Sequence, residues 1–189
     1  LNKDFNHVIK LFYKERKKCI KIMEMITEAS IEYVKKQVDC GIDCFQLFET
    51  YCGIIPEQLY TEFVLPYSKR ILNEAMNKNC KTIFFPKNYN LGLKQLNKDI
   101  CDIASVDWQI PIETARTLLD SDIGIQGNID PRILYSSYTD IEVYLSALKS
   151  FGEKNNNWII NLGHGFLPDI DYKKAKFVVE WIKQTNWKR

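Results

Sequence analysis

The chain has 189 residues, 46% of them hydrophobic, and a formal net charge of +2, which fits one globular domain or part of a larger one. Its basic residues are scattered apart from a short run at residues 14–18, so the sequence does not indicate a nucleic-acid-binding surface. No apolar run approaches the roughly 20 residues of a membrane-spanning helix, and no signal-peptide pattern is visible. We therefore expect a cytoplasmic enzyme without membrane or nucleic-acid partners.

The six cysteines are irregularly spaced and lie mostly in apolar or helical contexts, which predicts reduced thiols rather than a disulfide framework. Cys40 and Cys44 could form half of a metal site. A zinc site needs about four ligands, and no second pair or histidine cluster accompanies these two cysteines. We expect neither a metal nor a cofactor.

The N-terminal part predicts a long amphipathic helix followed by a strand. The helix should end at Cys40-Gly41, because glycine suits the left-handed cap, and a short apolar strand should run from Asp43 to Glu49. Pro56 fits the first turn of the next helix, and Pro66 should kink or divide that helix. The residues at helical spacing that predict the first helix are Ile20, Met23, Ile26, Ser30, Val34 and Val38.

The rest of the chain alternates short apolar strands with helices. This β-then-α order predicts parallel strands, because parallel neighbours need crossover connections and these are usually helical. The strands are too uniformly apolar for a half-exposed sheet. The expected strands are Lys81–Phe85, Ile103–Asp107, Ile123–Gln126 and Trp158–Leu162, and the expected helices are Leu91–Leu96, Pro111–Leu119, Asp140–Phe151 and Tyr172–Lys183.

Two parallel architectures compete, the open doubly wound sheet and the closed (β/α)8 TIM barrel. The glycine-rich phosphate loops typical of doubly wound folds are missing from this sequence. Polar residues at the ends of many strands favour the mouth of a barrel. About five βα units are present, so we expect residues 1–189 to form a single domain, the C-terminal part of such a barrel, with about three units upstream of Leu1. The polar strand ends are Thr50, Lys87, Asp107, Gln126, Asn128 and His164.

His164 directly follows the strand Trp158–Leu162 and lies between two glycines, which would let a ligand approach its imidazole closely. It could equally be a loop histidine bonded to neighbouring backbone. Alternation along a strand places Phe48 and Thr50 on one face with Gln46. If that face looks into the barrel, an aromatic floor and a hydroxyl meet His164 across a pocket, although Thr50 as a simple helix cap fits the sequence as well.

Two other polar segments could serve chemistry or architecture. Asp107 could act as a general base or accept backbone N–H groups near the following helix, and the structural role is favoured. The segment 126–131 combines amides, a flexible glycine and Asp130-Pro131, and architecture is again the favoured role. The sequence contains no serine-histidine-aspartate triad, nucleophile elbow or carboxylate pair, so hydrolases lack support.

Five segments together resemble the uroporphyrinogen decarboxylase family, in the order and spacing of its C-terminal half. The resemblance implies a (β/α)8 barrel and a homodimer. It also implies removal of CO₂ from the four acetate side chains of uroporphyrinogen III, which gives coproporphyrinogen III in haem biosynthesis, without metal or prosthetic group. The segments are Gln46–Thr50, Phe63–Tyr67, Val106–Trp108, Gln126–Pro131 and Asn161–Gly165.

The resemblance also implies roles for three residues of this chain. Thr50 takes the position of a substrate-binding serine or threonine, His164 that of a histidine contacting a substrate carboxylate, and Phe48 would line the cleft. The family's other principal site residues are an arginine-rich segment, an aspartate and a tyrosine, which lie upstream in the family and are not found here. No catalytic residue is therefore assigned in this chain, and alone it is expected to be inactive.

Two alternatives remain open at this point. Cobalamin-linked methyltransferases of the same superfamily bind zinc through His-x-Cys and a later cysteine, and the segment Phe85–Asn90 contains neither ligand type. An inactive truncated barrel is the other alternative. Its exposed edge strands and interior would predict aggregation or a need for the missing units.

Overall fold

The computed structural model describes residues 5–187, which alternate between helices and short strands. The elements in chain order are α1 (Asn6–Lys14), α2 (Arg16–Asp39), β1 (Cys44–Glu49), η1 (Cys52–Ile54), α3 (Glu57–Phe63), α4 (Leu65–Asn77), β2 (Lys81–Pro86), η2 (Asn90–Gln95), β3 (Ile103–Ser105), α5 (Ile112–Leu118), β4 (Gly124–Ile129), η3 (Pro131–Tyr135), α6 (Tyr138–Ala147), α7 (Lys149–Lys154), β5 (Trp158–Leu162) and α8 (Tyr172–Gln184). Here η denotes a short 3₁₀ helix. None of the helices in this range is long and apolar enough to cross a membrane.

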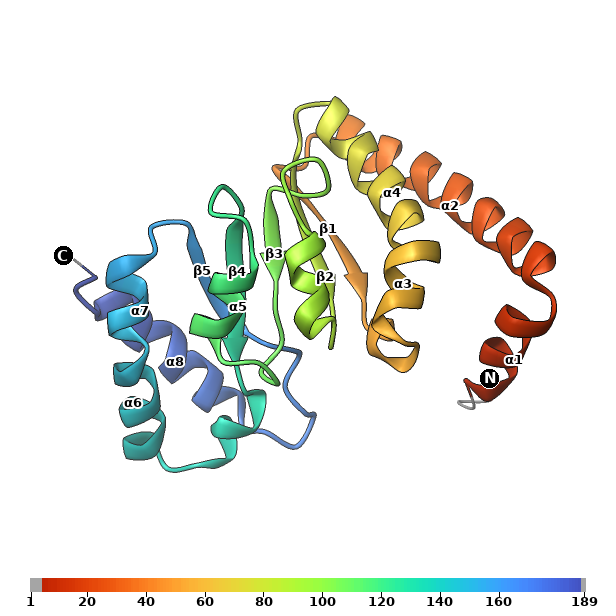
Figure 1. Ribbon diagram of the computed structural model, residues 1–189. Coiled ribbons are helices and arrows are strands. Elements are labelled where there is room, and N and C mark those ends of the chain that lie inside the picture. Colours follow the sequence, from red (N-terminus) through yellow and green to blue (C-terminus); the bar gives the residue numbers. More distant parts are fainter. Residues whose placement is uncertain (1–4, 188–189) are drawn as a thin grey trace.

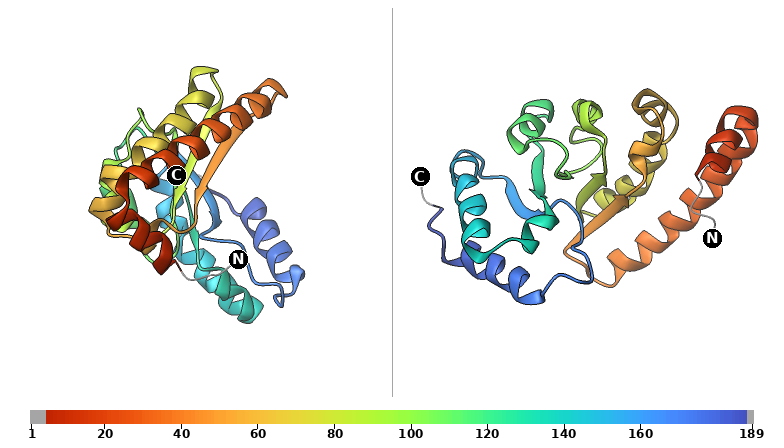
Figure 2. Two further views of the ribbon diagram at one scale, coloured as in Figure 1. Left: turned by 90° about the vertical axis from the view of Figure 1, so that its right-hand side faces the viewer. Right: turned by 90° about the horizontal axis from the view of Figure 1, so that it is seen from below.

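The strands form one parallel sheet in the order β1-β2-β3-β4-β5, so each strand pairs with its neighbours in sequence (Figure 1). This confirms the predicted α/β class and parallel pairing. The helices lie along the outer side of the curved sheet, which forms an open arc when viewed from below (Figure 2). Within the described residues β1 and β5 each pair on one side only, as expected for part of a barrel.

The core lies between the outer face of the sheet and the helices that cover it. Phe84 of β2, Ala104 of β3 and Ile125 of β4 are fully buried there, in one cluster with Leu72 and Ala75 of α4. A second cluster fills the space between β4, β5, α6 and α8. It contains Ile129, Leu134, Ile141, Leu145, Ile170 and Val178. β4 is buried along its whole length, although it carries the polar side chains of Gln126 and Asn128.

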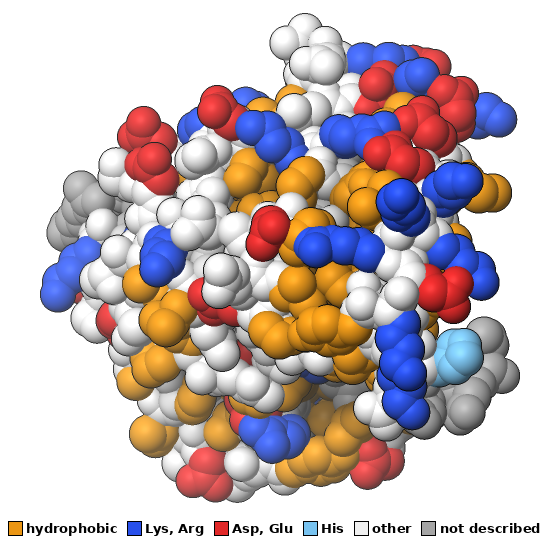
Figure 3. All heavy atoms as spheres, turned by 45° about the vertical axis from the view of Figure 1, so that its right-hand side comes forward, with side chains coloured by type: hydrophobic (Ala, Val, Ile, Leu, Met, Phe, Trp, Pro, Cys, Tyr) orange, Lys and Arg blue, Asp and Glu red, His pale blue; other side chains and the backbone are white. Residues whose placement is uncertain are grey.

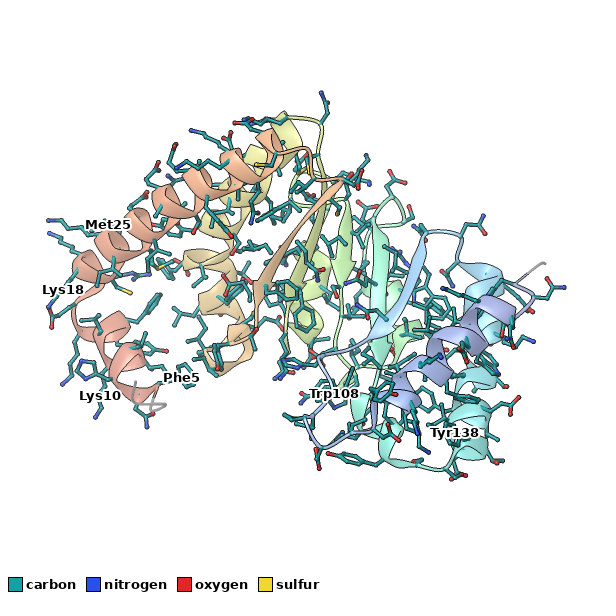
Figure 4. The ribbon with its side chains drawn as sticks, turned by 180° about the vertical axis from the view of Figure 1, so that it is seen from behind. Phe5, Lys10, Lys18, Met25, Trp108 and Tyr138 are labelled. Atoms are coloured by element: carbon teal, nitrogen blue, oxygen red, sulfur yellow. The ribbon has the colours of Figure 1, made fainter. Side chains whose placement is uncertain are left out.

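The N-terminal helices end where the sequence predicts, but the residues that α2 buries match the prediction only in part. α2 ends where expected, and Gly41 takes the left-handed conformation with a φ of 84°. Of the predicted apolar stripe, Val34 is buried and Val38 packs against the core, but Ile26 is 60% exposed and the neighbouring Thr27 is 2% exposed instead. Because α2 packs mainly on α4, the line of contact selects Thr27 and leaves Met25 on the outer side (Figure 4). Pro66 divides the next helix into α3 and α4, as predicted.

Several boundaries differ from prediction for identifiable reasons. Pro56 caps α3 rather than entering its first turn. The third strand ends at Ser105, because the next residues turn so that the Asp107 carboxylate can accept backbone N–H groups.

The fourth strand runs on to Ile129. The helix expected at residues 140–151 is divided at Leu148, and the one expected at residues 91–96 is the 3₁₀ helix η2, while β5 matches the prediction.

Apolar side chains also gather on the face that carries α1 to α4 (Figure 3). A groove of about 270 Å³ runs between the α1–α2 and α3–α4 pairs there. Arg16 stacks over the Phe63 ring at 3.4 Å, and Arg70 pairs with Glu24 at 2.6 Å. The groove thus has an apolar floor, and the charges at its rim are matched within the chain.

Candidate functional site

A cleft of about 450 Å³ lies on the inner side of the sheet, at the end where the strands terminate. All five strands or the loops directly after them contribute to its walls. Openings at the carboxyl ends of parallel strands are the usual site of ligands in barrel folds. The lining residues are Gln46, Phe48, Thr50, Phe85, Ser105, Gln126, Asn161, Leu162, Gly163, His164, Gly165 and Phe166.

The first wall of the cleft is β1, whose alternate side chains point inward as predicted. Gln46, Phe48 and Thr50 all line the cleft. Phe48 is 62% exposed, and its ring meets the edge of Phe85 with centroids 6.1 Å apart. Thr50 does not cap a helix, because Tyr51 occupies the position before η1. The side chains therefore offer an aromatic surface and a hydroxyl group to a ligand.

The opposite wall carries His164, which the preceding glycine holds in place. Gly163 donates its N–H to the Ile129 carbonyl at 2.7 Å. A Cβ atom on Gly163 would lie 2.7 Å from the backbone nitrogen of Trp108. Only glycine permits this close approach. The His164 ring is exposed and lies against Phe85 and Trp108, with centroid separations of 6.4 and 6.2 Å.

The backbone contact considered for His164 does exist, but it is long. Nδ1 lies 3.4 Å from the Gly165 carbonyl oxygen, near the limit of hydrogen-bond geometry. The imidazole therefore stays accessible to a ligand in the cleft. The structure brings Phe48, Thr50 and His164 into one cavity, although β1 and β5 stand at opposite edges of the sheet.

The floor of the cleft contains a polar pair, of which Gln126 was assigned to architecture from the sequence. Gln126 and Ser105 come from neighbouring strands, and the Gln126 amide donates a hydrogen bond of 3.0 Å to the Ser105 hydroxyl. Both residues are buried and both line the cleft. Gln126 is thus a candidate site residue. Its position at the end of an apolar strand was the available signal.

Asp107 lies behind this floor and fastens the loops that follow β2 and β3. Its carboxylate accepts the N–H of Asn88 at 2.6 Å and that of Gln109 at 2.8 Å, and the residue is 3% exposed. The amide of Asn128 donates to the carbonyls of Asp107 and Ile110 at 2.9 and 2.6 Å. The favoured structural role agrees with this geometry, but the N–H groups come from loops rather than from the start of α5.

Glu49 lies on the outer face of β1, away from the cleft. Burial raises the pKa of its carboxyl above the usual value, and a long contact of 3.5 Å from the Ser68 hydroxyl partly opposes that rise. The Tyr60 hydroxyl is buried in the same region without a hydrogen-bond partner. This group belongs to the packing between the sheet and α3–α4.

Three clustered residues, one of which packs against His164, were not proposed as site residues from the sequence. Lys87, Trp108 and Arg132 follow β2, β3 and β4, and both cationic groups lie over the Trp108 ring. The basic strand end at Lys87 was visible in the sequence. Its approach to Trp108 depends on how the loops converge, which a local pattern does not encode.

The described residues contain no group of three or more histidine, cysteine or acidic side chains arranged to hold a metal. Cys40 and Cys44 are both exposed free thiols, one in the cap after α2 and the other at the start of β1. The prediction that the protein works without metal stays a prediction.

Comparisons with known proteins give the fold and the family to which this chain is similar. A solved methyltransferase from Methanosarcina mazei matches 91% of the chain and 51% of its own chain, with a TM-score of 0.72 and 16% identity, which shows the fold alone. Uroporphyrinogen decarboxylases of Chlorobium chlorochromatii and Francisella tularensis subsp. novicida are 32% and 31% identical, over 99% and 98% of this chain.

The chain spans about half the length of these curated relatives, 55% in both cases. The model of the family described as uroporphyrinogen decarboxylase (URO-D) matches residues 1–185. That span includes every strand and the whole cleft. The chain belongs to the uroporphyrinogen decarboxylase family.

Proposed function

We propose that this chain forms the C-terminal wall of a uroporphyrinogen decarboxylase and binds the acidic tetrapyrrole that the enzyme decarboxylates. The observation that carries the proposal is the meeting of Thr50 and His164 in one cleft. These are the two positions to which the family resemblance assigned substrate contacts. The relatives that carry this name support the reaction class, a carboxy-lyase.

The chemistry of the cleft suits such a substrate. A tetrapyrrole offers large apolar ring faces, and Phe48 and Phe85 offer aromatic surface across the first two strands. Its acetate and propionate arms are carboxylates, which accept hydrogen bonds from the Thr50 hydroxyl and from an N–H of the His164 imidazole. The cleft therefore combines stacking surface with donors placed at opposite edges.

The proposed reaction makes modest demands on this wall. Protonation of a pyrrole α-carbon turns the ring into an electron sink, and the bond to the departing CO₂ supplies electrons to it. A proton then replaces CO₂ on the side chain, and loss of the α-carbon proton restores the pyrrole. The substrate supplies the electron sink itself, so the protein has to orient it, stabilise the developing positive charge and deliver protons. Thr50 and His164 orient the carboxylate arms in this scheme.

The family's remaining site residues, which the resemblance places upstream, bind the other carboxylates and the pyrrole N–H groups. We therefore propose that the 189-residue chain binds substrate without turning it over. Incubation of the purified chain with uroporphyrinogen under anaerobic conditions checks this point. Release of CO₂ at a catalytic rate would refute it.

The binding proposal is tested with uroporphyrin, the stable oxidised form of the substrate, by calorimetry. Thr50→Val and His164→Gln should each raise Kd by about fivefold to tenfold, the loss of one hydrogen bond to a charged group. Thr114→Val on α5 and His7→Gln on α1 are matched controls and should leave Kd unchanged. Equal effects of site and control variants would contradict the proposal.

The methyltransferase alternative is tested by the metal content of the purified chain. Thiolate-rich zinc sites retain their metal through purification. Under the decarboxylase proposal, zinc should be present at well below one equivalent. A full equivalent that is lost in Cys40→Ser or Cys44→Ser would favour the alternative.

We also propose that the enzyme containing this chain is a cytoplasmic homodimer, as the family resemblance implies. Sedimentation at micromolar concentration measures the assembly, and fractionation of the source cells measures the location. A monomer at all concentrations, in a protein of the relatives' full length, would contradict the dimer.

A further inference from the structure

Trp108 stands where the loops after four consecutive strands converge. The Lys87 ammonium lies 5.3 Å from the centroid of its indole ring, and the Arg132 guanidinium carbon lies 5.5 Å from it. The His164 ring meets the indole edge-on, with an interplanar angle of 89°. Figure 4 labels Trp108 at the end of the sheet where the strands terminate, beside the loop that follows β5.

The charges around this indole are not balanced. Arg132 is paired with Asp130 through contacts that include one of 2.7 Å, and this pairing lowers the pKa of the Asp130 carboxyl. The Asp107 carboxylate is occupied by two backbone N–H groups. Lys87 has no acidic partner within the part of the chain that the structure describes. Its ammonium group is therefore a positive charge that is free to bind an anion.

The backbone on both sides of this lysine is fixed. The Lys87 N–H donates to the Glu49 carbonyl at 3.2 Å, and the Lys87 carbonyl accepts the N–H of Gly53 at 3.1 Å. The next residue is held by Asp107. A cation whose backbone is anchored and whose side chain lies along an aromatic face loses less freedom when an anion binds, which favours binding.

We infer that Lys87, with Trp108 as its wall, forms a carboxylate-binding subsite beside His164, and that it takes an arm of the polycarboxylate ligand in the cleft. The identification of that ligand as a tetrapyrrole rests on the proposed function. The subsite itself rests on the geometry around Trp108. It extends the binding surface beyond the His164 wall of the cleft to the loops after β2 and β3.

A small, flat polycarboxylate tests the subsite without assuming a tetrapyrrole. Benzenehexacarboxylate is titrated into the ¹⁵N-labelled 189-residue chain at low salt, and the indole N–H signal of Trp108 is followed by NMR. The signal should shift saturably. Lys87→Gln should raise Kd about fivefold. Lys87→Arg should restore it, because a guanidinium keeps the charge, stacks on an aromatic ring and binds carboxylates.

Lys183→Gln on the last turn of α8 is the matched control, since it removes the same charge from an exposed helix position. Its Kd should equal that of the unchanged chain. A Trp108 signal that does not move, or a Lys87→Gln variant that binds as tightly as the unchanged chain, would overturn the subsite. Unchanged amide signals of β2 and β3 in Lys87→Gln show that the variant is folded.

Uroporphyrin then separates the two proposals. Binding that weakens about fivefold in Lys87→Gln supports both. Uroporphyrin binding that is insensitive to Lys87 overturns the subsite and leaves the proposed function standing. Binding of benzenehexacarboxylate through Lys87, together with no binding of uroporphyrin, supports the subsite and counts against the tetrapyrrole.

Discussion

Two aspartates flank β3, and they make nearly the same bond in different surroundings. Asp102 precedes the strand and accepts the N–H of Thr82 at 3.0 Å, with Lys81 and Lys98 nearby at 3.3 and 3.4 Å. Asp107 follows the strand and accepts the N–H of Asn88 at 2.6 Å. Asp102 therefore joins the beginnings of β2 and β3, and Asp107 joins the segments that follow the two strands.

The difference lies in what each bond holds in place. Asp102 is at the edge where the strands begin, in contact with exposed lysines, and it joins two strand ends. Asp107 is buried beneath the cleft and joins the loops from which Lys87 and Trp108 extend. In barrel folds the first edge usually serves stability and the second serves function. Two aspartates with similar bonds therefore play different parts, according to the end of β3 at which each one lies.

The largest effect is expected from removing the hydrogen bonds that the Asp107 carboxylate accepts. Asp107→Ala leaves the part-buried N–H groups of Asn88 and Gln109 without this acceptor, which should lower the free energy of unfolding by about 3 kcal/mol. Asp107→Asn keeps one acceptor and should cost about half of that. Urea denaturation measures both. A loss below about 1 kcal/mol in the alanine variant would show that water replaces the carboxylate and that the loops do not depend on it.

Gly163→Ala tests the packing of the His164 loop on Trp108. The added Cβ would lie 2.7 Å from a backbone nitrogen, so the loop must move, at a cost of about 2 kcal/mol. Uroporphyrin affinity should fall at the same time, because His164 moves with the loop. Gly165→Ala is the control, since its Cβ would meet nothing within 4 Å. Equal behaviour of the two variants in calorimetry and in denaturation would contradict the account.

Asp102→Asn tests the clamp at the other edge and should cost about 1 kcal/mol at neutral pH without changing uroporphyrin affinity. Partial burial opposes ionisation of Asp102, but the Thr82 N–H and the Lys81 ammonium outweigh it and lower its pKa. The stabilisation is therefore present above the pKa of the unfolded chain and is lost as the pH falls through the lower folded value.

Urea denaturation from pH 7 down to pH 2 measures this dependence. The two unfolding free energies should converge at the acid end, and Asp99→Asn, an exposed neighbour, should show no such difference. A constant gap between Asp102→Asn and the unchanged chain at all pH values would exclude the ionised carboxylate as the cause.

The smallest effect concerns Glu49, on the outer face of β1. Because burial raises its pKa, the protonated form is favoured in the folded state. Its contribution is fully present below the unfolded pKa and is lost as the pH rises through the folded pKa. Glu49→Gln should therefore be more stable than the unchanged chain at pH 8 and equal to it at pH 3. Thermal melting checks the order, and the reverse order would contradict it.

The sequence predicted the parallel α/β sheet because its strands are short, apolar and separated by helical segments. It also predicted that Phe48 and Thr50 share a face, since alternation along a strand is a local rule. The ends of β3 and β4 and the division at Leu148 were missed. The end of β3 depends on the carboxylate of Asp107 reaching a loop of another unit, and local propensity does not report such a contact.

The candidate site was predictable only in part for the same reason. Thr50 and His164 were singled out by their places at strand ends and by the resemblance, and both line the cleft. Gln126 was assigned to architecture although it reaches the floor. The cluster of Lys87 and Arg132 on Trp108 combines three loops, so only the folded chain reveals it.

The most direct test of the account is an NMR map of the uroporphyrin-binding surface on the ¹⁵N-labelled chain. The shifted amide signals should gather at the ends of the strands, at residues 48–50, 85–88, 107–108 and 161–166. Signals from the opposite edge around Lys81 and Lys98, and from the groove between α2 and α4, should stay in place. Shifts confined to either of these two regions would contradict the placement of the cleft and the function proposed for it.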